Sequence, residues 1–174
     1  MSEYPFKGKP YAFSVCRIEP ENNIHVILEA FSGDTVMPVV IVGNWQNSDY
    51  GKKLLEKYKD CPAVYQLSPI YDPIRLNELR GKCTLYLHGH SCGGTNPSLV
   101  EAMYLGLPIA AFDVNFNRET TENQALYFKN ADELKMLCHN ASDTDLKSIG
   151  RRMKAIADRR YTWQRISECY SKLL

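Results

Sequence analysis

Residues 88–106, HGHSCGGTNPSLVEAMYLG, combine a glycine-rich turn with a helix start, an arrangement that can hold an anion. An apolar strand is predicted to enter the turn at Gly93 and Gly94. Asn96 is a favourable N-cap and Pro97 suits the first turn, so the free amides of the helix start would point over the glycines. The chemistry that this pattern favours is the binding of an anionic group by backbone amides.

The same glycines are also what a tight strand-to-helix connection needs, so the turn alone does not identify an anion site. No Gly-Lys-Ser/Thr sequence follows it, which argues against a Walker loop. The spacing also differs from the Gly-x-Gly-x-x-Gly pattern of a dinucleotide fold. Neither of these nucleotide motifs is therefore predicted.

Two charged residues could complete a nucleotide site around the turn. Glu101 falls in the second turn of the predicted helix, where its carboxylate can accept hydrogen bonds from neighbouring hydroxyls of a ribose. The alternative for Glu101 is a capping box with Ser98. Arg17 follows the first predicted strand, and its guanidinium can bind a pyrophosphate in a fork. The alternative for Arg17 is a surface ion pair with Glu19 or Glu21.

His88, His90 and Cys92 alternate along an extended segment, a pattern that admits a metal site and with it a metal-dependent hydrolase. A fourth ligand and a closed spacing motif are missing. We therefore predict no metal and no cofactor, and we expect one histidine, His90, to shape the binding pocket instead.

The elements that would position these residues follow a βαβ rhythm, in which short apolar runs alternate with amphipathic segments. Six such strands imply an α/β fold, a three-layer Rossmann-like architecture with a doubly wound parallel sheet. Ligands bind such sheets outside the carboxyl ends of the strands. The expected strands cover residues 11–16, 39–43, 63–67, 83–87, 108–112 and 126–128. The expected helices cover residues 24–31, 50–58, 74–79, 97 to the stop at Gly106, 120–124 with Thr120 or Thr121 as cap, 131–138, 143–160 and 163–173.

A chain of 174 residues, 44% of them apolar, is long enough for one domain with its own core. We expect a single domain over residues 1–174. Residues 1–9 are predicted to form a flexible N-terminal extension, and residues 131–174 a helical C-terminal segment.

The net charge of +1, without long runs of either sign, argues against nucleic acid as a partner. The six cysteines are scattered without a paired spacing, which is typical of reduced thiols. No apolar run is long enough to span a membrane and the start lacks an apolar signal core. We expect a cytoplasmic protein, whose peripheral contact with the inner membrane, if any, would be made through another domain.

Taken together, these motifs resemble the carboxy-terminal, nucleotide-sugar-binding half of a retaining glycosyltransferase of family 4, which has the GT-B fold of two Rossmann-like domains. The resemblance covers nearly the whole chain and begins at residues 11–24. It is strongest at residues 93–108, which are similar to the donor-site signature of a subgroup that includes bacterial rhamnosyltransferases of surface polysaccharide assembly. Residues 113–128 also resemble that subgroup. Residues 161–164 resemble the start of the closing helix that crosses to the partner domain.

The resemblance implies that Arg17 contacts the donor pyrophosphate and Glu101 the ribose hydroxyls, and these two are the predicted catalytic residues. The amides after Gly94 would meet the distal phosphate or the sugar, while Ile70 and Tyr71 would line the base. The predicted donor site comprises Arg17, Ile70, Tyr71, His90, Gly93, Gly94, Thr95, Asn96, Ser98 and Glu101.

The chain departs from the family pattern at two places. The paired-glutamate motif Glu-x7-Glu would place its first carboxylate at position 93, where this sequence has Gly93. Many relatives also carry a lysine five or six residues after the arginine, where this chain has Asn22 and Asn23. Neutralisation of a pyrophosphate would therefore rest on Arg17 and on helix amides.

The function that the resemblance implies is transfer of a sugar from a nucleotide-diphosphate sugar to a hydroxyl acceptor in bacterial glycan synthesis. The N-terminal GT-B domain would be missing from this chain, which we expect to be inactive alone. The glycan or lipid-linked acceptor would bind elsewhere. The alternative is a non-catalytic nucleotide-binding or partner-docking Rossmann-like module, because a fold alone does not establish chemistry.

Overall fold

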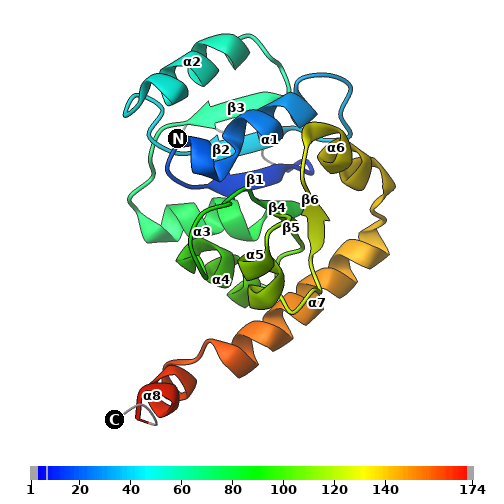
Figure 1. Cartoon of the computed structure of the whole chain (residues 1–174). Helices are drawn as coiled ribbons and strands as arrows, with labels where there is room; N and C mark the ends of the chain where they lie inside the picture. The colour runs from blue at the N-terminus through cyan, green and yellow to red at the C-terminus, as the bar shows by residue number, and fades with distance from the viewer. Residues whose placement is uncertain (1–3, 7, 172–174) are drawn as a thin grey trace.

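Six parallel strands form one sheet in the computed structural model, which describes residues 4–6 and 8–171 (Figure 1). The strands are β1 (Ala12–Val15), β2 (Val39–Val42), β3 (Val64–Leu67), β4 (Leu85–His88), β5 (Ile109–Phe112) and β6 (Leu126–Phe128). Their order in the sheet is β3-β2-β1-β4-β5-β6. The order reverses between β1 and β4, so the prediction of a doubly wound parallel sheet is confirmed.

Helices cover both faces of this sheet, as Figure 1 shows. They are α1 (Ile24–Phe31), α2 (Asp49–Tyr58), α3 (Pro73–Gly81), α4 (Pro97–Tyr104), α5 (Asn115–Thr120), α6 (Ala131–Asn140), α7 (Asp143–Arg160) and α8 (Trp163–Ser171), with a short 3-10 helix η1 (Pro20–Asn22). Helices α1 and α6 pack against each other on one face, and α4 and α7 on the other.

The sheet has an apolar core on each face, because neighbouring side chains of a strand point to opposite faces. On β2, Val39 and Ile41 join the core under α1 and α6, whereas Val40 and Val42 join the core under α4 and α7. Buried strands of this kind read as continuous apolar runs. The three-layer architecture predicted from those runs is therefore observed.

The ends of α4 follow the expected local signals. The Asn96 Oδ1 atom accepts a hydrogen bond from the Ser98 amide, so Asn96 is the N-cap and the capping box starting at Ser98 is not formed. At the other end Gly106 has a φ of 67°, and its amide donates to the Met103 carbonyl. Glycine suits this left-handed position, which ends the helix as predicted.

The helix expected over residues 120–124 is wrong, because α5 spans Asn115–Thr120. Instead of capping a helix start, the Thr120 and Thr121 hydroxyls donate to carbonyls one turn earlier in the chain. Glu122 and Asn123 then take positive φ values of 50° and 57°, which ends the helix.

Within residues 1–9, which the sequence predicts to be a flexible extension, Phe6 is buried and only 2% exposed. Its ring lies 5.1 Å from the Tyr11 ring and 4.9 Å from the Tyr65 ring, measured between centroids. Burial of an aromatic ring contributes stabilising apolar contact. Phe6 therefore packs into the folded domain, while residues 1–3 and 7 lie outside the described residues.

The C-terminal segment is helical to Ser171, as expected, and residues 172–174 lie outside the described residues. Helix α8 lies at the far end of α7, away from the sheet (Figure 1). At its start the Trp163 side chain is 86% exposed. No helix among the described residues is long and apolar enough to cross a membrane.

Candidate functional site

The loops after β1 and β4 touch each other at the point where the strand order reverses. The Ser91 amide donates a 2.8 Å hydrogen bond to the Glu21 carbonyl, and the Ser91 hydroxyl donates to the same oxygen at 3.0 Å. A Cβ atom at Gly89 would lie only 2.1 Å from the Asn22 carbonyl oxygen, so this close approach requires glycine. The structure thus brings the Arg17 loop and the glycine turn together.

Two asparagines hold these loops in place. The buried Asn22 donates through Nδ2 to the Arg17 carbonyl at 2.8 Å, and its Oδ1 lies 2.9 Å from His90 Nδ1. Asn23 has a φ of 47° and donates through Nδ2 to the Gly89 carbonyl at 2.9 Å. At positions 22 and 23, where many relatives in the pattern described above carry a lysine, this chain therefore has neutral groups that join two loops.

The Arg17 side chain is 79% exposed and lies 3.8 Å from the Glu21 carboxylate, the ion pair that was one alternative for it. An exposed pair of this kind contributes about 0–1 kcal/mol, so it does not prevent Arg17 from binding another anion. Arg17 also lines a hollow of about 370 Å³ at the carboxyl ends of β1, β2 and β3. Ile70 and the exposed Tyr71 line the same hollow, so three predicted site residues are brought together.

The glycine turn presents amides without partners. Gly93 has a φ of 100°, and a Cβ atom at Gly94 would have no heavy atom within 4 Å. Among the described residues, the amides of Gly93, Gly94 and Thr95 donate to no other group. Ser98 differs, because its amide and hydroxyl both donate to Asn96 Oδ1. The groups free to meet an anion are therefore in the turn itself and not at Ser98.

Glu101 lies outside the hollow that Arg17 lines, and its carboxylate is paired with Arg80. The Arg80 Nη1 atom donates to Glu101 Oε2 from a side chain that is only 4% exposed, whereas the Glu101 side chain is 58% exposed. Sequence reasoning missed Arg80, whose only signal is a cation in the last turn of α3. The free oxygen of Glu101 is the one that could accept from a ligand.

The possible metal ligands His88, His90 and Cys92 differ in how far they are buried. Burial, and secondarily the neighbouring His90, lower the pKa of the buried His88 to about 3. The two imidazole rings are 6.0 Å apart, whereas Cys92 is exposed. The described residues contain no group of three or more His, Cys, Asp or Glu side chains placed to hold a metal ion.

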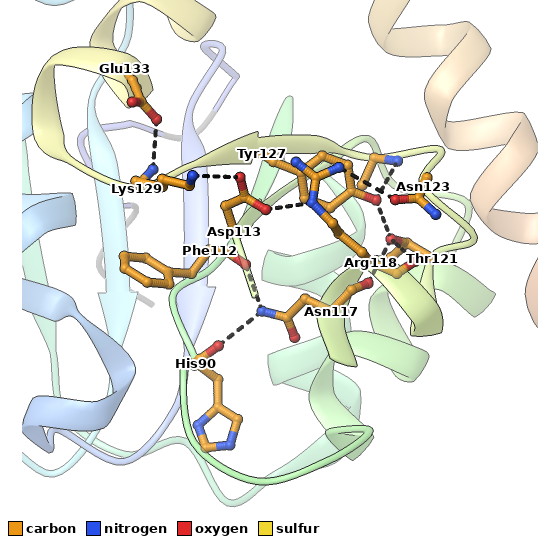
Figure 2. A network of polar contacts seen from close by, with 11 residues as sticks. His90, Phe112, Asp113, Asn117, Arg118, Thr121, Asn123, Tyr127, Lys129 and Glu133 are labelled. Carbon is orange, nitrogen blue, oxygen red and sulfur yellow. Dashed lines mark hydrogen bonds and ion pairs between the residues drawn. The ribbon is translucent and has the colours of Figure 1, made fainter. Parts of the chain in front are cut away.

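A polar network behind the turn was not predicted (Figure 2). Asn117, with no exposed surface, donates through Nδ2 to the carbonyls of His90 and Phe112, both at 2.9 Å. Nearby, Arg118 is hydrogen-bonded to Asp113, which lowers the pKa of that carboxyl group, and Lys129 adds to the effect. The bond from Asn117 to His90 fastens α5 to the segment that leads into the glycine turn. The sequence signal was limited to the polar stretch at residues 117–121.

The sequence from residue 2 to residue 143 matches the family described as glycosyl transferases group 1. No curated protein matches the chain. Similar solved structures include Anabaena HepE in complex with UDP, with 21% identity over 93% of this chain and 48% of that chain, and a TM-score of 0.79. Sucrose-phosphate synthase from Thermosynechococcus elongatus has 16% identity over 95% and 46% of the two chains, with a TM-score of 0.78. The E. coli trehalose-6-phosphate structure bound with UDP-2-fluoro glucose has 14% identity over 94% and 43%, with a TM-score of 0.75.

These likenesses show the fold, a Rossmann-like half of the GT-B architecture. This chain spans about half the length of each of these solved chains.

Proposed function

Because the chain belongs to the glycosyl transferases group 1 family, we propose that the carboxyl edge of its sheet binds a nucleotide-diphosphate sugar as glycosyl donor. The observation that carries this proposal is the joining of the β1 and β4 loops, because it connects the loop that carries Arg17 to the segment that leads into the unpaired amides of the glycine turn. Two of the similar structures are complexes with UDP and with UDP-2-fluoro glucose, which supports the same ligand class.

In this arrangement the donor lies across the point where the strand order reverses, between β1 and β4. Ile70 and Tyr71 border the hollow that takes the base, and Arg17 on its rim meets the pyrophosphate. The amides of Gly93, Gly94 and Thr95 bind the distal phosphate or the sugar. Glu101, held by Arg80 through one oxygen, offers the other to the ribose hydroxyls.

The chemical task of these groups is to stabilise the charge that develops on the leaving diphosphate. A guanidinium and fixed amides can do so without reorganising during the reaction. We propose that transfer goes to a hydroxyl with retention at the anomeric carbon, in bacterial glycan or surface polysaccharide synthesis, and that the sugar is a hexose or rhamnose. The acceptor, a glycan or a lipid-linked molecule, would bind a second GT-B domain in the cytoplasm, peripheral to the inner membrane.

Nuclear magnetic resonance of the ¹⁵N-labelled chain tests where the nucleotide binds. Addition of UDP, or of deoxythymidine diphosphate, should shift the amide resonances of Gly93, Gly94 and Thr95 together with those of Ile70 and Tyr71. Shifts confined to residues outside the glycine turn and the hollow, or no shifts with either nucleotide, would contradict the proposal. Titration with inorganic phosphate is the control, because a bare anion should move the turn resonances and leave the base hollow unchanged.

A non-catalytic nucleotide-binding module remains the alternative, and Gly93 favours it, since the carboxylate of the family pattern is missing there. The two functions differ in turnover. A protein that joins this chain to an acceptor domain should release diphosphate from its donor only if the catalytic proposal holds. Binding of the nucleotide without turnover of UDP-glucose or deoxythymidine diphosphate-rhamnose would favour the alternative.

A further inference from the structure

His90 is fixed at both its ring and its backbone by buried asparagines. Asn22 Oδ1 lies 2.9 Å from His90 Nδ1. Asn117 Nδ2 donates to the His90 carbonyl (Figure 2), at a distance of 2.9 Å. Both asparagine side chains are almost fully buried. A side chain held in this way has a defined direction, which is the property that a binding group needs.

The contacts of Asn22 determine which nitrogen of His90 carries the proton. The Arg17 carbonyl can only accept, so the Asn22 atom facing it at 2.8 Å must be the amide nitrogen. The oxygen of Asn22 therefore faces His90, and it too can only accept. It follows that the neutral imidazole donates from Nδ1 and carries an unshared electron pair on Nε2.

The Nε2 atom is directed at the glycine turn. It lies 3.8 Å from the position that a Cβ atom of Gly93 would occupy, and it has no hydrogen-bond partner among the described residues. The ring is flanked by Phe116 and His88, with centroids 6.1 and 6.0 Å away. The acceptor nitrogen of His90 thus lies close to position 93, where the paired-glutamate pattern would have a carboxylate side chain.

We propose that His90 Nε2 accepts a hydrogen bond from a hydroxyl of the donor sugar and so replaces the carboxylate missing at Gly93. Asn22 is the positioning residue that fixes the tautomer. This inference rests on the proposed function, since it assumes that a diphosphate-sugar lies over the turn. A neutral acceptor there adds no negative charge beside the diphosphate, in contrast to a glutamate.

Calorimetry of wild type and His90→Phe, each with UDP, UDP-glucose, deoxythymidine diphosphate and deoxythymidine diphosphate-rhamnose, tests the inference. The substitution should lower the affinity for the diphosphate-sugar that binds by about tenfold, as for the loss of one well-placed hydrogen bond. It should change the affinity for the nucleoside diphosphate by less than twofold. His139→Phe, an exposed histidine on α6, is the matched control and should change neither.

Equal losses for the sugar-bearing and sugar-free nucleotides would overturn the inference, because His90 would then act on the phosphates. An unchanged affinity for the diphosphate-sugar would overturn it as well, while the proposed function would stand. If wild type binds neither nucleoside diphosphate, the proposed function fails and the inference fails with it.

The tautomer gives a second test, which needs no variant. Long-range ¹H–¹⁵N correlations of the wild-type imidazole should show neutral His90 protonated at Nδ1. A His90 ring protonated at Nε2 would have no free electron pair directed at the turn and would overturn the inference.

Discussion

At the residue scale, three asparagines hold the loops of the candidate site in one geometry. Asn22 and Asn23 join the β1 loop to the β4 loop, and Asn117 joins α5 to the β4 loop. Asn117 and Asn22 are buried with their donors used, and such groups are costly to leave without partners. The site is therefore shaped by neutral hydrogen bonds, with Arg17 as its exposed cation.

Two glycines of this region should differ sharply in their tolerance of alanine. In Gly89→Ala the new Cβ would lie 2.1 Å from the Asn22 carbonyl oxygen, so the loops must move apart. We expect a loss of about 2 kcal/mol or more in the free energy of unfolding, measured with urea. Gly94→Ala is the matched control, since no heavy atom lies within 4 Å, and should change stability by less than about 0.5 kcal/mol. Similar losses in the two variants would contradict the close approach of the loops.

His88 should make the protein less stable in acid. Its folded-state pKa of about 3 lies below the ordinary 6.5, so between these pH values the unfolded chain binds more protons than the folded one. The His88 contribution is fully present above about pH 6.5, and it is lost as the pH falls toward 3, by up to about 1.4 kcal/mol per pH unit.

Urea unfolding of wild type and His88→Leu at several pH values between 8 and 4.5 measures this contribution. The variant should lose less stability than wild type as the pH falls, while the exposed His139→Leu should follow wild type. Parallel stability profiles for wild type and His88→Leu would show that His88 is not held neutral by burial.

At the element scale, the local signals were sufficient for most helices and strands. The helix over residues 24–31, the helix over 143–160 and the strand over 126–128 are observed with the expected bounds. They are specified by apolar periodicity and by caps, which act over a few residues. The position of α5 was not predictable in this way, because the threonines taken as caps donate to the preceding turn instead.

The ion pair between Arg80 on α3 and Glu101 on α4 should contribute to the free energy of unfolding. Glu101→Ala leaves the buried Arg80 guanidinium without its acidic partner. Because Glu101 is more than half exposed, we expect a loss of only about 1–2 kcal/mol in the free energy of unfolding. Glu101→Gln retains an acceptor and should lose less.

The control for this prediction is Glu56→Ala, which removes an exposed glutamate paired with the exposed Lys59. It should change stability by less than about 0.5 kcal/mol. If Glu101→Ala is as harmless as Glu56→Ala, the pair does not hold α3 and α4 together. Glu101→Gln is also the better variant for ligand binding, since a weakened α4 could imitate the loss of a ribose contact.

At the scale of the whole molecule, the fold and the meeting of the two loops could be predicted, because a doubly wound sheet places its strand ends at one edge. The contacts that shape the site could not be predicted from the sequence. Asn22 meets His90 across 68 residues of chain, and Arg80 meets Glu101 across 21, so no local pattern marks either pair. The glycine-rich turn was recognisable, whereas the groups that border it came from the tertiary structure.

Within the proposed function, donor binding is the part that this chain should show by itself, because the groups proposed to bind the donor all lie in it. In the proposed function, Arg17 and the glycine turn form an anion site for the diphosphate of the donor. A variant of Arg17 addresses this claim directly, because the side chain is exposed and its removal disturbs only a weak pair with Glu21.

The deciding measurement is calorimetric titration of wild type, Arg17→Ala and the control Arg152→Ala with UDP and with deoxythymidine diphosphate. Arg152 is an exposed arginine on α7, bonded to Ser148. We predict that wild type and Arg152→Ala bind at least one nucleotide equally well, and that Arg17→Ala binds it about tenfold or more weakly, as for the loss of a charge-assisted contact. Absence of binding by wild type, or equal affinity of Arg17→Ala and wild type, would contradict a diphosphate site that includes Arg17.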